Sequence, residues 1–106
     1  MVLELAAAQE VDLAAARGVA LLALGRNDDA AAAWRKGIEL DARSSRAHAG
    51  LAATLVASGK AADAVTAARK AVELDPNSGM AHAILGAALM AADPKAWNDA
   101  IAEAQD

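Results

Sequence analysis

The most constraining feature of this chain is an internal repeat with a period of thirty-four residues. When the sequence is shifted by that length, Leu21 aligns with Leu55 and Leu89, and Gly25 aligns with Gly59. The segments at 29–30, 35–36 and 39–41 (Asp-Ala, Arg-Lys and Glu-Leu-Asp) also recur one period later. A fixed period in this range is typical of solenoids, which stack copies of one supersecondary unit. Residues 45–78 form the clearest unit.

The composition favours helices. Apolar residues make up 57% of the chain, but more than half of them are alanine, and Trp34 and Trp97 are the aromatic side chains. Alanine is the best helix former and lets helices approach closely. Val, Ile and Thr do not cluster in alternation, so no strand is predicted. At 106 residues, we expect a single all-α domain over 1–106 with a modest core.

Charge and residue content exclude several functions. The net charge of −4 opposes nucleic-acid binding, which needs a surplus of Lys and Arg. The chain has no cysteine, which excludes disulfides and zinc–thiolate sites. No apolar run is long enough to span a membrane. The acidic segment 1–10 lacks the basic start of a signal peptide, and of the compartments left open the cytoplasm is favoured.

Stop and start signals divide the chain into six predicted helices. Gly25 and Gly59 are natural helix ends, and Pro76 breaks the chain between two helices. The helices are expected at 3–24, 28–40, 46–58, 61–74, 79–91 and, starting at residue 94 or 95, up to 104. The first helix is unusually long. An alternative is that residues 3–6 end a preceding helix, but no turn signal follows them.

Polar residues just before these helices are predicted to act as N-caps, because their side-chain oxygens can accept from free backbone N–H groups. For the second helix the predicted cap is Asn27 or Asp28, and for the third it is Ser44 or Ser45.

These features resemble the tetratricopeptide-repeat family over about residues 11–104. Within 45–78, the residues that match the family pattern are Leu51, Ala52, Leu55, Gly59, Ala64, Ala71 and Pro76. The resemblance implies a right-handed superhelical array of antiparallel helix pairs, with about three repeats. Repeat 1 covers about 11–44 with a helical extension over 1–10, repeat 2 covers 45–78, and repeat 3 covers 79–106 with its second helix shifted or truncated. Arg17 departs from the pattern because a Leu is usual there.

Small residues recur where paired helices of such an array must touch. These positions are Gly18, Ala52 and Gly86, then Ala30 and Ala64, then Gly37 and Ala71. Larger side chains are expected to fill the remaining space between the helices, namely Leu21, Leu40, Leu55, Leu74 and Leu89.

The resemblance also implies a concave face formed by the first helix of each pair, which binds a peptide or helix of a partner protein. The candidate partner-binding residues on that face are Asp12, Ala15, Val19, Leu22, Arg46, Ala49, Ala53, Val56, Met80, Ala83, Ile84, Ala87 and Met90. The alternative is that its alanines simply pack against a neighbouring helix. The basic clamp with which some members grip a C-terminal carboxylate is missing, because its positions hold Ala15, Val19, Gly50, Met80 and Ile84.

Trp97 and Ile101 lie on the last predicted helix, with no further helix to cover them. They define a candidate self-association edge, so a homo-oligomer is the rival to a peptide-binding module. A docking domain taken from a larger protein is a third alternative.

The remaining polar residues favour structural roles. His48 and His82 lie one period apart without a third metal ligand, so we expect half-buried histidines and no metal site. The recurring Arg-Lys pairs at 35–36 and 69–70 fit helical pairing with Glu39 and Glu73, with a stripe for an anionic partner as the alternative. Catalytic residues and cofactors are not predicted, since the serines at 44, 45, 58 and 78 lie at helix ends.

Overall fold

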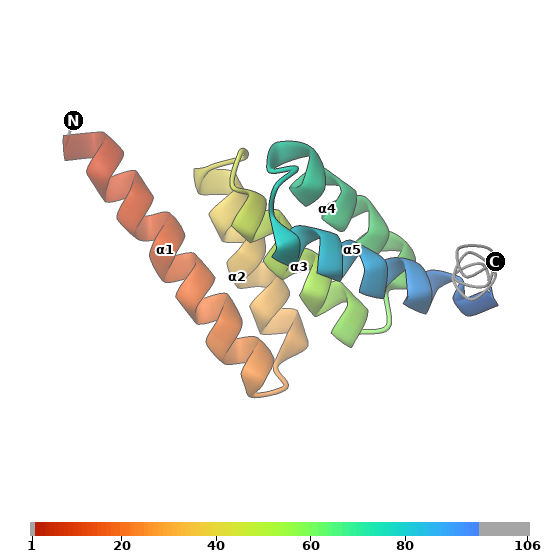
Figure 1. The fold of residues 1–106 in the computed structure, drawn as a ribbon. Coiled ribbons are helices and arrows are strands. Elements are labelled where there is room, and N and C mark those ends of the chain that lie inside the picture. The colour runs from red at the N-terminus through yellow and green to blue at the C-terminus, as the bar shows by residue number, and fades with distance from the viewer. Residues whose placement is uncertain (1, 96–106) are drawn as a thin grey trace.

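The protein folds as a row of antiparallel helices (Figure 1). A computed structural model describes residues 2–95, with side chains from residue 9 onward. Its helices are α1 (Val2–Ala23), α2 (Asn27–Leu40), α3 (Ser45–Ala57), α4 (Ala61–Leu74) and α5 (Gly79–Ala92). No strand occurs within residues 2–95. The all-helical repeat array is therefore confirmed, while the sixth predicted helix, with Trp97 and Ile101, lies outside the described residues.

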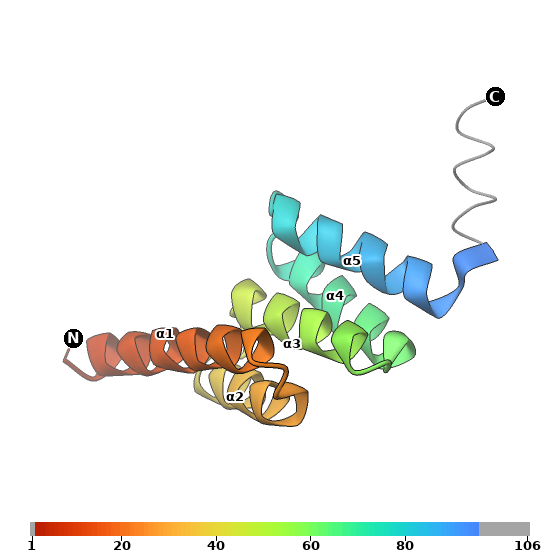
Figure 2. The same cartoon turned by 90° about the horizontal axis from the view of Figure 1, so that it is seen from below.

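The helices form two layers. Helix α3 packs against α1, α2, α4 and α5 and so occupies the centre of the array. Seen from below, α1, α3 and α5 line one side, whereas α2 and α4 line the other (Figure 2). We call the first set the inner layer and the second set the outer layer. Helix α1 is one unbroken helix of 22 residues, as predicted, against 13 or 14 residues in each of the others. None of the helices in residues 2–95 combines the length and hydropathy needed to cross a bilayer.

The turns within the two complete helix pairs have the same conformation. Gly25 and Gly59 both have φ +78°, in the left-handed region where glycine is favoured. After each glycine, the next backbone N–H donates to a leucine carbonyl five residues earlier, from Arg26 to Leu21 and from Lys60 to Leu55. The predicted turn glycines therefore end their helices as expected.

The N-cap predicted for α2 is wrong. Arg26 takes the cap position without a side-chain cap bond, and Asn27 is already helical. The glycine turn closes so tightly that a single residue separates Gly25 from the helix. The Arg26 side chain instead forms an ion pair with Asp29, at 2.6 Å.

Serine caps begin α3 and α5. Ser44 Oγ accepts from the Ala47 N–H at 3.1 Å, and Ser78 Oγ accepts from the Ala81 N–H at 3.1 Å. Of the two predicted caps for α3, Ser44 is the one observed. Ser45 has another role, because its Oγ donates to the Ala71 carbonyl at 2.9 Å and so links α3 to α4.

The core consists mostly of alanine. Within residues 9–95, eight alanines are fully buried, namely Ala30, Ala49, Ala52, Ala64, Ala68, Ala71, Ala81 and Ala88. Among the leucines expected between the helices, Leu55 is buried and the other four are half-buried. Trp34 is the large exception, with 3% of its surface exposed. Small side chains let the helices pack closely, and the Trp34 ring fills the space beside Gly18 and Gly50.

Candidate functional site

A hollow of about 250 Å³ opens on the face formed by α1, α3 and α5. Three helices of the inner layer supply seven of its eight lining residues, and α2 supplies one from behind. The lining consists of Val19, Leu22, Trp34, Arg46, Gly50, Ala53, Met80 and Ile84. We call this the inner hollow. The three helices that supply most of its lining, α1, α3 and α5, can be followed in Figure 2.

Six of the predicted concave-face residues line this one space: Val19, Leu22, Arg46, Ala53, Met80 and Ile84. Asp12, Ala83, Ala87 and Met90 are exposed but lie outside its lining. Val56 is half-buried against a cluster that contains Leu55, Ala64 and Ala88.

Ala15 and Ala49 differ from the expectation, because neither offers a surface to a partner. Ala15 is 3% exposed and packs with Ala30 and Trp34. Ala49 is fully buried and packs with Ala71 and Ala81. These two alanines lie where α1 and α3 meet their neighbouring helices, so they belong to the core.

Trp34 is the lining residue that sequence reasoning missed. Its indole lies between Gly18 of α1 and Gly50 of α3. A Cβ built on either glycine would lie 2.5 Å from ring atom Cε2. Side chains do not approach that closely, so both helices pass the ring at distances that only glycine allows. The ring therefore spaces α1 from α3 beneath the inner hollow.

Corresponding positions of the two repeats carry a sequence signal for this arrangement. One period later, the three positions of Gly18, Trp34 and Gly50 are occupied by Ala52, Ala68 and Ile84. The outer-layer position holds the large Trp34 in the first repeat and the small Ala68 in the second. The inner-layer position that follows holds the small Gly50 in the first case and the large Ile84 in the second. Such an exchange of volume keeps a core filled. It indicates that the two positions face the same space.

The inner hollow carries hydrogen-bond donors but no acidic side chain. Arg46 is its single charged lining residue, is exposed, and makes no ion pair within the described part of the chain. Trp34 Nε1 is buried without a hydrogen-bond partner. Buried polar groups normally find a partner, so this N–H is an unsatisfied donor next to an apolar hollow.

A second hollow, of about 440 Å³, opens on the other side of α3. It lies between the two outer helices, with α3 beneath it. Its lining residues are Ile38, His48, Leu51, Leu55, Asp63, Thr66, Ala67 and Lys70.

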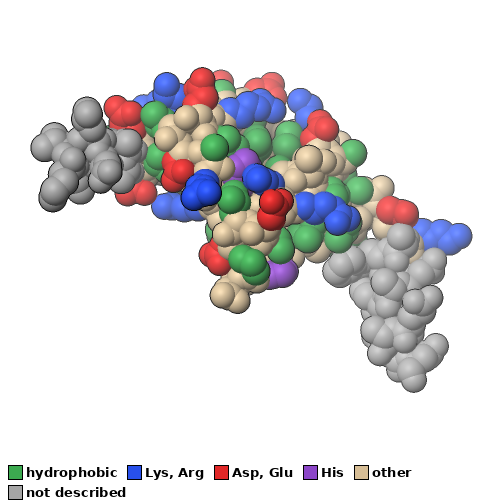
Figure 3. All heavy atoms as spheres, turned by 90° about the horizontal axis from the view of Figure 1, so that it is seen from above, with side chains coloured by type: hydrophobic (Ala, Val, Ile, Leu, Met, Phe, Trp, Pro, Cys, Tyr) green, Lys and Arg blue, Asp and Glu red, His purple; other side chains and the backbone are tan. Residues whose placement is uncertain are grey.

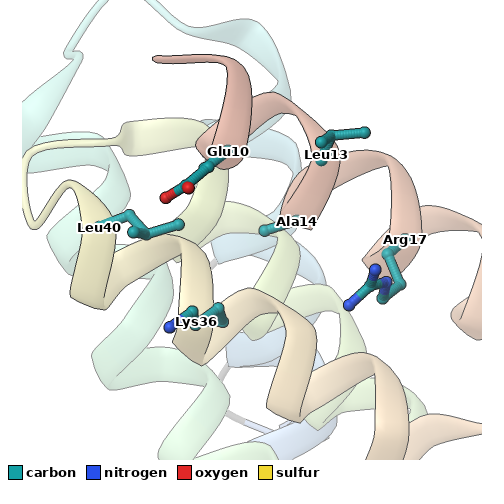
Figure 4. Close-up of a pocket in the computed structure, with 6 residues that line it drawn as sticks. All are labelled: Glu10, Leu13, Ala14, Arg17, Lys36 and Leu40. Atoms are coloured by element: carbon teal, nitrogen blue, oxygen red, sulfur yellow. The ribbon is translucent and has the colours of Figure 1, made fainter. Parts of the chain in front are cut away.

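A third hollow, of about 250 Å³, lies between α1 and α2 at the first edge of the array. Glu10 and Leu40 point toward each other across it, whereas Leu13 points away (Figure 4). Arg17 stands where the next repeat has Leu51. This edge is therefore more polar than the corresponding internal position.

The histidines bind the loops that precede their helices. His48 Nε2 donates to the Ala42 carbonyl at 3.0 Å, and His82 Nε2 donates to the Pro76 carbonyl at 2.7 Å. His48 is half-buried, as expected, but His82 is exposed because its helix lies at the end of the described array. On the face shown in Figure 3 the two purple histidine patches lie apart. Residues 9–95 contain no group of three side chains placed to hold a metal ion.

The recurring Arg-Lys pairs lie on solvent-exposed positions of the outer helices. Lys70 and Glu73 form an ion pair at 3.7 Å, whereas Glu39 forms none in the described part of the chain. Figure 3 shows both signs of charge interspersed. Exposed pairs of this kind contribute at most about 1 kcal/mol each, so they have little influence on the fold.

Comparison with known families agrees with the architecture. The family model of the tetratricopeptide repeat matches residues 15–79 and, in a second match, residues 50–106. Together the two matches cover most of the chain. Comparison with curated proteins and with solved structures finds no significant match.

Proposed function

Because the chain belongs to the tetratricopeptide-repeat family, we propose that it is a protein-interaction module that holds a segment of a partner protein in the inner hollow. Repeats of this family generally mediate contacts between proteins or act as scaffolds. The inner hollow is the place on the described surface that best suits such a contact.

The observation that carries the proposal is the clustering of exposed apolar side chains around the inner hollow. Val19 on α1 and Met80 on α5 both line the hollow, and each is 53% exposed. Removing apolar surface from water contributes a favourable free energy of about 25 cal/mol per Å² of area covered. Met80 is also unbranched and flexible, which lets it adapt to different partner side chains.

The local hydrogen bonds of the candidate nucleophiles support a role without catalysis. Ser44 and Ser78 cap helices, Ser45 donates to α4, and Ser58 Oγ donates to the Thr54 carbonyl at 2.9 Å. Each hydroxyl is therefore used locally, and none is bonded to a histidine. We propose that the module supplies binding and positioning alone.

Glutamate substitutions in the inner hollow test the proposal. A random peptide library displayed on phage would be selected against the wild-type protein, and single clones would be measured against Val19→Glu and Met80→Glu. Both sites are half-exposed, so these variants should remain folded. We expect both to lose at least about tenfold in affinity, because a buried charge without a partner is costly.

Leu24→Glu is the matched control, since Leu24 is 71% exposed at the end of α1 and lies outside the hollow. It should bind the selected peptides as the wild type does. If no peptide is enriched, or if the selected peptides ignore both hollow variants, the proposal is wrong.

Self-association remains the rival, with the second copy covering the apolar surface. Light scattering across a concentration series measures it directly. A stable dimer that Val19→Glu dissociates would assign the inner hollow to contact between copies. A monomer at all concentrations leaves the hollow free for another protein.

A further inference from the structure

We infer that the segment held in the inner hollow is acidic, with an apolar side chain that enters the hollow and an Asp or Glu placed to meet Arg46. This inference rests on the proposed function and names the chemistry of the partner. It concerns a side-chain carboxylate within the partner segment, so it needs no free C-terminus.

The distribution of charge around the inner hollow is the first argument. The chain carries 14 acidic residues against 10 Lys and Arg, yet α3 and α5 contain no Asp or Glu at all. Arg46 is the single Lys or Arg on these two helices. Helix α1, which also lines the hollow, carries Glu10 and Asp12 outside the lining. Arg46 is therefore the one charge within the lining, and it is positive in a protein whose net charge is −4.

The state of Arg46 is the second argument. Its side chain is exposed at the edge of an apolar space and has no ion pair within residues 9–95. Asp12, at the equivalent position one period earlier on α1, is exposed and is not part of the lining. A segment entering the hollow would thus meet a guanidinium that forms no ion pair with a carboxylate of the described chain.

The hydrogen-bonding character of the lining is the third argument. The exposed Arg46 guanidinium is a donor, and no side chain of the lining is an acceptor. A partner whose side chains are basic or rich in donors would find no side chain in the lining that can accept its hydrogen bonds. A carboxylate is an acceptor only, so it complements this lining in both charge and hydrogen bonding.

The size of the inner hollow favours a peptide. Small-molecule sites usually enclose about 300 to 1,000 Å³. The inner hollow, at about 250 Å³, is smaller and is open to one side of the array. It accommodates the side chains of a segment that lies across α1, α3 and α5, with the backbone of that segment outside.

The test is a peptide selection on proteins that differ in one charge. The random library would be selected against wild type, Arg46→Glu and Arg35→Glu. Arg35 is exposed on α2 outside the inner hollow, so its reversal changes the net charge equally. We expect wild type and Arg35→Glu to enrich Asp or Glu beside an apolar anchor, and Arg46→Glu to enrich Lys or Arg there.

A double-mutant cycle then locates the contact. For one selected peptide, made with an amidated C-terminus, replacing its acid by Gln should weaken binding to wild type by about two- to fivefold. The same replacement should have no effect on binding to Arg46→Gln. Added salt should weaken the wild-type complex more than the Arg46→Gln complex.

The outcomes separate the two proposals. The acidic-segment inference is overturned if Arg46→Glu and wild type enrich the same sequences. It is also overturned if replacing the peptide acid by Gln weakens binding to wild type and to Arg46→Gln equally. In both cases the binding role stands. If no sequence is enriched, or if both Val19→Glu and Met80→Glu leave binding intact, both proposals fall.

Discussion

The indole of Trp34 on α2 lies directly against Gly50 of α3. A Cβ on Gly50 would lie 2.5 Å from the indole atoms Cδ2 and Cε2 and 2.6 Å from Cε3. The ring cannot move away, because Gly18 lies against it from α1 at a similar distance. The spacing between the first two inner helices, and so the floor of the inner hollow, depends on this contact.

Gly50→Ala should therefore destabilise the protein. Alanine improves helix propensity by about 1 kcal/mol, but overpacking against a ring held on both sides costs about 1–3 kcal/mol. We expect a net loss of about 1 kcal/mol, measured by urea unfolding with circular dichroism. Gly79→Ala is the control, because a Cβ there meets nothing within 4 Å. A Gly50→Ala variant as stable as the control would contradict the packing described.

Trp34→Ala should cost about 3–5 kcal/mol, since it removes the large buried side chain of the first repeat. Adding Gly50→Ile should recover part of that loss, because Ala68 and Ile84 form the same pair one period later. Thermal unfolding of the single and double variants measures the recovery. In the wild-type background Gly50→Ile should be strongly destabilising. If Gly50→Ile changed the stability of wild type and of Trp34→Ala equally, the two sites would not share a space.

Gly59→Ala should destabilise through the backbone alone. Gly59 has φ +78°, and a Cβ there would meet no atom within 4 Å. The left-handed conformation costs an alanine about 1–2 kcal/mol. Gly59→Asn should lose less, because asparagine tolerates this region better. Urea unfolding of the two variants compares them, and an alanine variant as stable as wild type would rule out this turn conformation.

Ser45→Ala should remove the hydrogen bond between α3 and α4. The Ser45 hydroxyl donates to the Ala71 carbonyl at 2.9 Å in a partly buried setting, and such a bond contributes about 1 kcal/mol. Ser44→Ala tests the neighbouring cap, with a loss of about 0.5–2 kcal/mol. Hydrogen exchange should distinguish them: Ser44→Ala should expose the Ala47 amide at the start of α3, whereas Ser45→Ala should leave that amide protected.

Much of the fold could be predicted because its signals are local. The period of thirty-four residues and the turn glycines predicted five helices that the structure confirms to within about one residue at each end. Ala52, Ala64 and Ala71, predicted as contact points, are fully buried. Turn geometry and helix propensity act within a few residues, so a sequence displays them directly.

The site was predicted only in part. Helical spacing placed Val19, Arg46 and Met80 on one face, and the structure brings them to one hollow. The same spacing also placed Ala15 and Ala49 there, although both are buried. Spacing along a helix defines a face, but the rotation of that face toward solvent or toward a neighbour depends on how the helices pack.

The sequence by itself determined the helices, their turns and their order, because backbone preferences and small-residue positions repeat with the period. Only the tertiary structure decided that Trp34 reaches between α1 and α3, and that Arg46 is left as the one charged residue of the inner hollow. The physical reason is volume. Whether a large side chain fits between two helices depends on the residues of both, and here two glycines distant in the sequence make the space for one indole.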